Sequence, residues 1–307
     1  MVDFGKQLDK LQLLVEVVSL ADRILSIFGT RPEIIKMSPI ILALQKRSDI
    51  VNTIVHSGQH YDLEMSQIFI EELGLPQPDM NINVGSGSHA EQTSKMLVGY
   101  EDAMKKYHPE LVIAEGDTNT VVAAGLSAIK LNIPFCHVEA GLRCYDRRMP
   151  EEINRMIADD CAQICLAPTH RSAMNLMYEG IPPHRVYIAG NTIVDACTKN
   201  IRIAEKKSSI MRDLGLSKKK TLITITIHRP ENVDSREKIK SIVNSLIELK
   251  EYEIVFPVHP RTNSALLVSG LRQDMERHDH IILTKPMGYF DFLKLLSHSD
   301  LIATDSG

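Results

Sequence analysis

Three acidic side chains stand where they could carry a proton to and from a carbon atom. Glu139 comes directly after a predicted buried strand over 133–138. Asp117 follows another short apolar run, and Glu151 stands just after Pro150, a residue favoured at the first position of a helix. Ligands of open parallel sheets bind at the carboxyl ends of the strands. Carboxylates that converge on a ligand there can remove a proton and return one.

Helix capping is the alternative explanation for these acids. Acidic residues in a first turn complement the helix dipole, which is the leading explanation for Glu152 and the lesser one for Glu151. Asp117 is a residue type favoured at helix N-caps. Glu139 has no helix to cap. Since the acids come from successive units along one predicted sheet edge, we do not expect capping to account for all of them.

The stretch 24–36 predicts a strand, a tight turn and a helix with Pro32 at its start. Backbone N–H groups and the helix dipole attract anions at such a helix start, so we expect Arg31 to face a phosphate. Lys36 is explained equally well as a solvated surface residue. The stretch matches neither a Walker loop nor the Gly-x-Gly-x-x-Gly fingerprint.

Polar residues follow other predicted strands as well, namely Gln59, His60, His228, Arg229 and His259. Each of these residues is weak evidence for a binding site on its own, because turns favour polar residues anyway. The stretch 84–88, Val-Gly-Ser-Gly-Ser, is explained equally by a hinge and by a loop over a ligand.

Composition limits the class of protein. The chain has 307 residues, 44% of them hydrophobic, which is an ordinary composition for a globular protein. Its formal net charge of −4 does not indicate a basic surface of the kind that binds nucleic acid. No apolar run is long enough to span a bilayer. The five cysteines lack metal-type pairing and fit a reducing cytoplasm, with Cys161 and Cys165 expected in the core. We expect no metal and no cofactor.

Strands and helices alternate along the chain, which predicts an α/β protein with two Rossmann-like parallel-sheet domains. We expect a helical N-terminal extension over 1–22, a first domain over 23–189 and a second domain over 190–307. Functional residues follow strands in both domains, so a ligand is expected in the cleft between them.

The motifs together carry a family resemblance. From Arg23 onwards the chain resembles the non-hydrolysing UDP-N-acetylglucosamine 2-epimerases, a family whose fold is similar to the two-domain GT-B glycosyltransferases. The resemblance rests on seven motifs in the family's order, which are Phe28–Glu33, Gly116–Thr118, His137–Arg143, Met149–Glu152, His228–Asn232, His259–Pro260 and Thr304–Gly307.

This resemblance implies a reaction that inverts C2 of UDP-N-acetylglucosamine by eliminating UDP to a 2-acetamidoglucal and adding UDP back, for cell-surface polysaccharide synthesis. The implied catalytic residues are Asp117, Glu139, Glu151 and His228. Substrate binding is implied for Arg31, Lys36, Ser306 and Gly307, and binding of an activating second UDP-sugar for Gln59, Arg229 and His259. The resemblance also implies a homodimer.

Several alternatives remain open at the level of sequence. Related epimerases act on a UDP-2,3-diacetamido uronic acid, and others hydrolyse their product. A GT-B glycosyltransferase would share the fold, and a non-catalytic nucleotide-sugar binder would share the motifs. Family members continue beyond Thr304–Gly307. The second domain is therefore expected to be incomplete, and this chain is expected to bind UDP poorly and to turn over slowly or not at all.

Overall fold

The computed structural model describes residues 21–58, 69–216 and 220–305. It divides into two compact units between Ala196 and Cys197, within helix α8 (Thr192–Lys207). The sequence placed the division earlier, after Ala189, where a strand ends. The expected N-terminal helix lies outside the described residues, except for the last two positions of its range.

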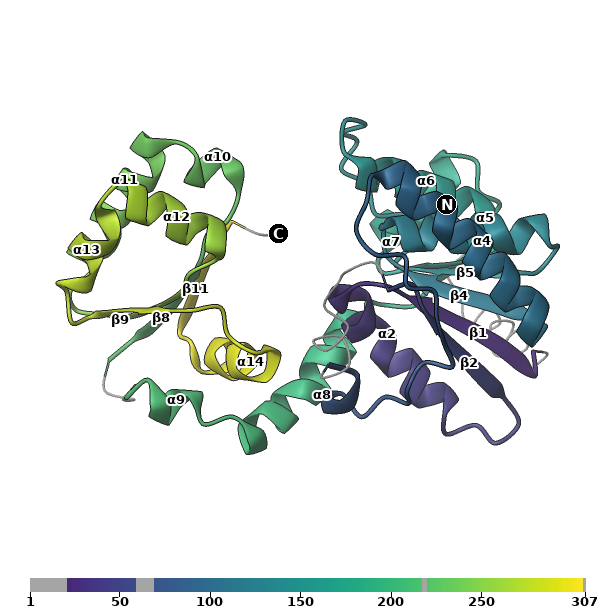
Figure 1. Cartoon of the computed structure of the whole chain (residues 1–307), viewed down its shortest axis with the longest axis horizontal. Coiled ribbons are helices and arrows are strands. Elements are labelled where there is room, and N and C mark those ends of the chain that lie inside the picture. Colours follow the sequence, from purple (N-terminus) through teal and green to yellow (C-terminus); the bar gives the residue numbers. More distant parts are fainter. Residues whose placement is uncertain (1–20, 59–68, 217–219, 306–307) are drawn as a thin grey trace. The chain divides into compact units, whose positions relative to one another are not determined.

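The first unit is built on a parallel sheet of seven strands in the order β3-β2-β1-β4-β5-β6-β7 (Figure 1). The strands are β1 (Arg23–Phe28), β2 (Val51–His56), β3 (Met80–Asn81), β4 (Leu111–Glu115), β5 (Phe135–Val138), β6 (Ile164–Ala167) and β7 (Val186–Ile188). All pairings along this order are parallel, so every strand ends at the same edge. The predicted α/β class with parallel sheets is confirmed.

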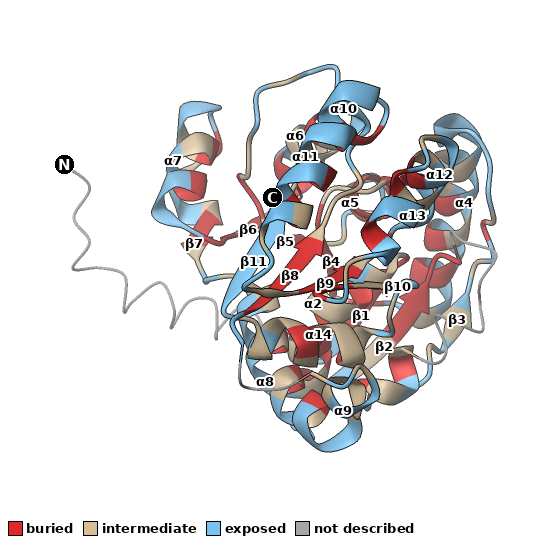
Figure 2. Cartoon of the chain, turned by 90° about the vertical axis from the view of Figure 1, so that its left-hand side faces the viewer, coloured by how far each residue is buried: buried red, intermediate tan, exposed pale blue. Residues whose placement is uncertain are grey.

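Helices cover both faces of this sheet, with α2 on one side and α4, α5 and α6 on the other (Figure 1). The helices are α2 (Arg31–Leu44), α4 (His89–Tyr107), α5 (Asn119–Lys130), α6 (Pro150–Cys161) and α7 (His170–Tyr178). Burial on two faces explains why the central strands β1, β4 and β5 are mostly apolar and buried at successive positions rather than at alternate ones, and these strands are red in Figure 2.

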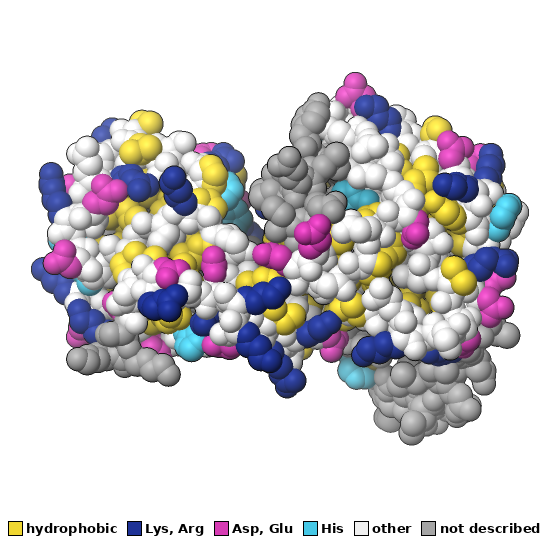
Figure 3. Space-filling view, turned by 60° about the horizontal axis from the view of Figure 1, so that its bottom comes forward, with side chains coloured by type: hydrophobic (Ala, Val, Ile, Leu, Met, Phe, Trp, Pro, Cys, Tyr) yellow, Lys and Arg dark blue, Asp and Glu magenta, His cyan; other side chains and the backbone are white. Residues whose placement is uncertain are grey.

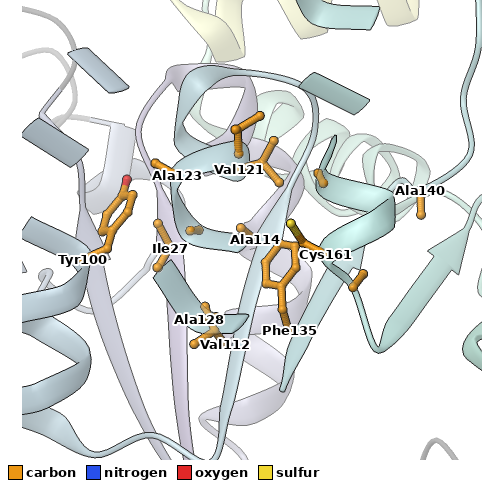
Figure 4. Packing of buried hydrophobic residues seen from close by; sticks show 14 of the residues in the cluster. Ile27, Tyr100, Val112, Ala114, Val121, Ala123, Ala128, Phe135, Ala140 and Cys161 are labelled. Carbon is orange, nitrogen blue, oxygen red and sulfur yellow. The ribbon is translucent and has the colours of Figure 1, made fainter. Parts of the chain in front are cut away.

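The core of the first unit lies between this sheet and α4 to α6 (Figure 4). Phe135 and Cys161 meet there, and a Cβ added at Gly125 would stand 2.9 Å from the Phe135 ring, so α5 packs close to the sheet only because Gly125 has no side chain. Cys161 and Cys165 are both buried in this core, as expected, and all five cysteines are free.

The long helix α4, between Ser88 and Leu111, is an element that was not predicted from the sequence. Its start is marked by a capping box in which Ser88 Oγ accepts from the Glu91 amide and Glu91 Oε2 accepts from the Ser88 amide. This Ser-x-x-Glu pattern was the signal that could have revealed the helix.

The second unit has a four-stranded parallel sheet in the order β10-β9-β8-β11. Its strands are β8 (Leu222–Thr226), β9 (Glu253–Pro257), β10 (Ile281–Thr284) and β11 (Leu301–Thr304). Its helices are α9 (Ile210–Asp213), α10 (Pro230–Val233), α11 (Arg236–Glu248), α12 (Pro260–Val268), α13 (Leu271–Glu276) and α14 (Tyr289–His298). Among the described residues, no helix has the length and apolarity needed to cross a membrane. On the face drawn in Figure 3, charged side chains of both signs are interspersed.

Candidate active site

A cluster of one ammonium and two carboxylates lies at the carboxyl edge of the first sheet. Lys36 of α2 extends to Glu115, the last residue of β4, with Nζ 2.9 Å from Oε1, and it also donates to Oε2 of Glu139, the residue after β5. Asn191 Nδ2 donates to the other oxygen of Glu139 at 3.1 Å. Lys36 is therefore a member of the site rather than a solvated surface residue.

Burial and neighbouring charges shift the pKa values of these three groups in different directions. Burial opposes the Lys36 charge, but Glu115 and Glu139 outweigh it and raise the pKa of the ammonium. Burial raises the pKa of Glu115 well above its ordinary value, and a hydrogen bond with Glu139 adds to the rise while Lys36 opposes it. Burial also acts to raise the pKa of Glu139, yet hydrogen bonds with Glu115 and Lys36 lower it below its ordinary value.

Asp117 lies two residues beyond β4 and is held by the first turns of α6. Arg155 donates to Asp117 Oδ2 from Nη2 at 2.6 Å and from Nε at 3.1 Å, and Asn154 Nδ2 donates to the Asp117 carbonyl oxygen at 2.9 Å. The N-cap of α5 is Thr118 instead. The capping explanation of Asp117 is therefore wrong.

The two acids that begin α6 differ in their surroundings. Glu152 is buried and accepts hydrogen bonds from the amides of Cys144 and Tyr145 and from Arg155 Nη1, so it fixes the loop that leads into the helix. The Glu151 side chain makes no hydrogen bond or ion pair with any residue in the described part of the chain. It stands four residues before Arg155, one helical turn away on the same side of α6. This side is the one that meets Asp117.

Glu139 has φ of +71°, an uncommon backbone conformation for a residue with a side chain. A buried network supports the turn around it. His137 lies between the Gly116 carbonyl oxygen, 2.8 Å from Nε2, and Asp159 Oδ1, 2.6 Å from Nδ1. Asp159 Oδ2 accepts from the Gly141 amide at 3.2 Å and from Arg143 at 2.7 Å. The network joins the loops after β4 and β5, which carry Asp117 and Glu139.

Replacing Gly141 by alanine is expected to disrupt the same turn. Gly141 has φ of +78°, and a Cβ built there would stand 2.3 Å from the Ser172 carbonyl oxygen. We expect G141A to lower the free energy of unfolding, by more than the roughly 1–3 kcal/mol of backbone strain alone. Gly180 is the matched control, since it has φ of +97° but open space around its Cβ position. Urea denaturation of both variants measures the difference, and equal losses would contradict the steric account.

The start of α2 forms a second structured part of this edge. Glu33 is buried, and its Oε2 accepts from the amides of Gly29 at 2.6 Å and Thr30 at 2.8 Å, while Oε1 accepts from Thr118. Arg31 is the first residue of the helix, and its guanidinium lies 5.7 Å from the centre of the Phe69 ring. The loops after β1 and β4 are thus fastened together beside Arg31.

In the second unit, Asp305 organises the loop after β8. Its carboxylate accepts from the amides of His228 and Arg229 and from Asn232 Nδ2, and His228 Nδ1 lies 3.4 Å from Oδ1. The rings of His228 and His259 are 5.6 Å apart. His228, Arg229 and His259 therefore lie together at the carboxyl ends of β8 and β9, beside the end of β11.

The structure also contains site residues that the sequence analysis did not select. Glu115, Arg155 and Asn191 each contact a predicted acid, Asp117 or Glu139, as described above. A polar side chain in the last position of an apolar strand was the signal for Glu115. Three predicted residues, Gln59, Ser306 and Gly307, lie outside the described residues.

Comparison with known proteins identifies the family. The family model for UDP-N-acetylglucosamine 2-epimerase matches residues 42–307. The chain belongs to this family. The UDP-N-acetylglucosamine 2-epimerase of Methanocaldococcus jannaschii is 46% identical over 285 residues, which are 92% of this chain and 78% of the relative.

Solved structures of other 2-epimerases share the fold of this family member. The M. jannaschii enzyme superposes with a TM-score of 0.83 at 44% identity, covering 92% of this chain and 79% of that one. The Neisseria meningitidis enzyme, solved bound to UDP-GlcNAc, superposes with a TM-score of 0.80 at 32% identity. The match covers 93% of this chain and 78% of that one. The UDP-2,3-diacetamido-2,3-dideoxy-D-glucuronate 2-epimerase of Pseudomonas aeruginosa is a more distant relative, 37% identical over 289 residues that cover 93% of this chain and 78% of that protein. The resemblance inferred from the motifs, and with it the GT-B-like fold class, is confirmed.

Proposed function

We propose that this 2-epimerase family member interconverts UDP-N-acetylglucosamine and UDP-N-acetylmannosamine. The reaction would proceed by elimination of UDP to 2-acetamidoglucal and re-addition of UDP. The observation that carries the proposal is the edge of the first sheet, where Glu139 is paired with Lys36 and Asp117 with Arg155 at the ends of neighbouring strands. Carboxylates held in this way are suited to proton transfer at C2.

The proposed roles follow from the order of events. The C2 proton is a poor acid, so cleavage of the C1–O bond must lead, and cations must stabilise the charge that develops on the departing diphosphate. We assign this to Arg31, with His228 close to the β-phosphate or the leaving oxygen, and we assign binding of the diphosphate to Ser306 and Gly307. Inversion requires protonation of C2 from the opposite face, so one carboxylate is not sufficient. We assign this exchange to the set Asp117, Glu139 and Glu151.

Identity favours this substrate over the uronic acid alternative. The relatives named for UDP-N-acetylglucosamine reach 46% identity, whereas the uronate epimerase reaches 37%. We further propose cytoplasmic action, in keeping with the five free cysteines, as well as a homodimer. Activation by a second UDP-sugar would involve Arg229, His259 and Gln59.

Proton NMR of UDP-N-acetylglucosamine incubated with the full-length protein in D₂O tests the function. We expect deuterium to enter at C2 while the signals of the manno epimer appear, because the proton that returns comes from a group equilibrated with solvent. A sample without protein is the control. An unchanged UDP-sugar would overturn the proposal. Release of free N-acetylmannosamine would instead indicate hydrolysis, and turnover only with an added acceptor would indicate a glycosyltransferase.

A further inference from the structure

Glu115 has no role in the function proposed above, yet it is the most deeply buried member of the Lys36 cluster. Its side chain is 1% exposed, against 12% for Glu139 and 23% for Lys36. Its Oε1 lies 2.9 Å from Lys36 Nζ, and the same ammonium is paired with Oε2 of Glu139, so the two carboxyl groups meet at one lysine. A hydrogen bond between two carboxyl groups requires a proton on one of them.

Charge balance gives the same requirement. One ammonium with two ionised carboxylates would leave a net charge of −1 in a largely buried place, which is costly. Two carboxylates that share a site do not both ionise readily. A single proton shared by Glu115 and Glu139 makes the cluster with Lys36 neutral.

The surroundings place that proton on Glu115. Both oxygens of Glu139 accept hydrogen bonds, Oε2 from Lys36 and Oε1 from Asn191 Nδ2. Asn191 is fixed in this orientation, because its Oδ1 accepts from the Ile193 amide at 3.1 Å. Such donors stabilise the ionised form of Glu139, whereas the deeper Glu115 loses more by ionising.

We propose that Glu115 is a positioning residue: as a neutral carboxylic acid it donates a hydrogen bond to Glu139 and holds that carboxylate ionised and oriented for proton transfer. The inference rests on the proposed function, in which Glu139 exchanges a proton with C2. Within the described ranges, the charged groups that face Glu115 are Lys36 from α2 and Glu139 from the turn after β5. Arg155 of α6 pairs with Asp117 and Glu152 instead, and Glu33 of α2 bonds the turn after β1.

Two substitutions test whether Glu115 acts as a neutral hydrogen-bond donor or as an ionised carboxylate. E115Q keeps the shape, an N–H to donate to Glu139 and an oxygen to accept from Lys36, so it should retain most of kcat. E115L fills a similar volume but donates nothing. We expect it to lower kcat by roughly 10- to 100-fold, the loss of one hydrogen bond to a charged group, with little change in KM. Thermal melting checks that each variant is folded.

The pH profile gives a readout that a merely structural role would not move. Without the donor, the pKa of Glu139 rises, so in E115L the acid limb of kcat/KM should move to higher pH, while in E115Q it should stay in place. An E115Q variant as slow as E115L would overturn the inference, because Glu115 would then be needed as an ionised carboxylate. An acid limb that does not move in E115L would also overturn it, because Glu115 would then only fill space in the core.

Infrared spectroscopy tests the proton on Glu115 without any turnover. At neutral pH, the wild-type protein should show the carbonyl band of a buried carboxylic acid, and E115Q should lack it. Identical spectra would overturn the inference even if the protein epimerises UDP-N-acetylglucosamine. If instead the wild-type protein leaves the substrate unchanged while the band is present, the proposed function is wrong but the proton on Glu115 is still supported.

Discussion

Replacing Glu139 by glutamine is expected to lower kcat by about 10²- to 10⁴-fold, the typical contribution of a positioned proton-transfer group. The amide keeps the shape of the side chain and can still accept from Lys36, so KM should change little. Glutamine cannot take up or return a proton, which is why the loss should appear in kcat. The measurement is steady-state epimerisation followed by NMR or by product chromatography.

The pH dependence of the unsubstituted enzyme should agree with this role. Hydrogen bonds with Glu115 and Lys36 lower the pKa of Glu139 against the effect of burial. The ionised form therefore persists as the pH falls through the ordinary range of a glutamate, and activity that depends on it should persist likewise. Glu101 is the control, because it lies on the exposed side of α4 in an ion pair with Lys105, and E101Q should be fully active. An E139Q variant within a factor of about ten of wild type would contradict the assignment.

Replacing Asp159 by alanine should lower the free energy of unfolding by roughly 3–5 kcal/mol, because it removes one partner of a buried charge network. The side chains of Asp159, His137 and Arg143 are all at most 2% exposed. Without the carboxylate, the Arg143 guanidinium would keep Glu179 but lose its most buried partner, and the Gly141 amide would lose its acceptor. Urea denaturation followed by circular dichroism measures the change.

An exposed ion pair provides the comparison for Asp159. Asp146 bonds Arg148 on the surface of the loop before α6, and the Arg148 side chain is 90% exposed. D146A should therefore leave the unfolding midpoint unchanged. If D159A were no less stable than D146A, the network would be unnecessary for the fold. If D159A remained folded under assay conditions, its kcat would also fall, because the turn that carries Glu139 would lose its support.

Much of this protein was determined by sequence alone. The runs at 24–28, 111–114 and 222–226 are strands because their residues are mostly β-branched or aliphatic and none is charged, which fits a sheet covered on both faces. Their alternation with helices gave the α/β class. The motifs that follow the strands gave the family, since the carboxyl edge of a parallel sheet gathers those residues whatever the helices between them contain.

Tertiary structure alone decided what each polar residue contacts. Lys36 and Glu139 are 103 residues apart, and Asp117 and Arg155 are 38 apart, so no local pattern could show that they pair. The sequence made Asp117 a possible helix cap, but the structure gives that position to Thr118 and turns Asp117 toward Arg155. In the sequence, Glu115 is only the first residue after the apolar run 111–114. Its burial beside a second carboxylate follows from the packing of β4 against β5 and α2. The free energy of a buried charge depends on its neighbours in space rather than on its neighbours in the chain.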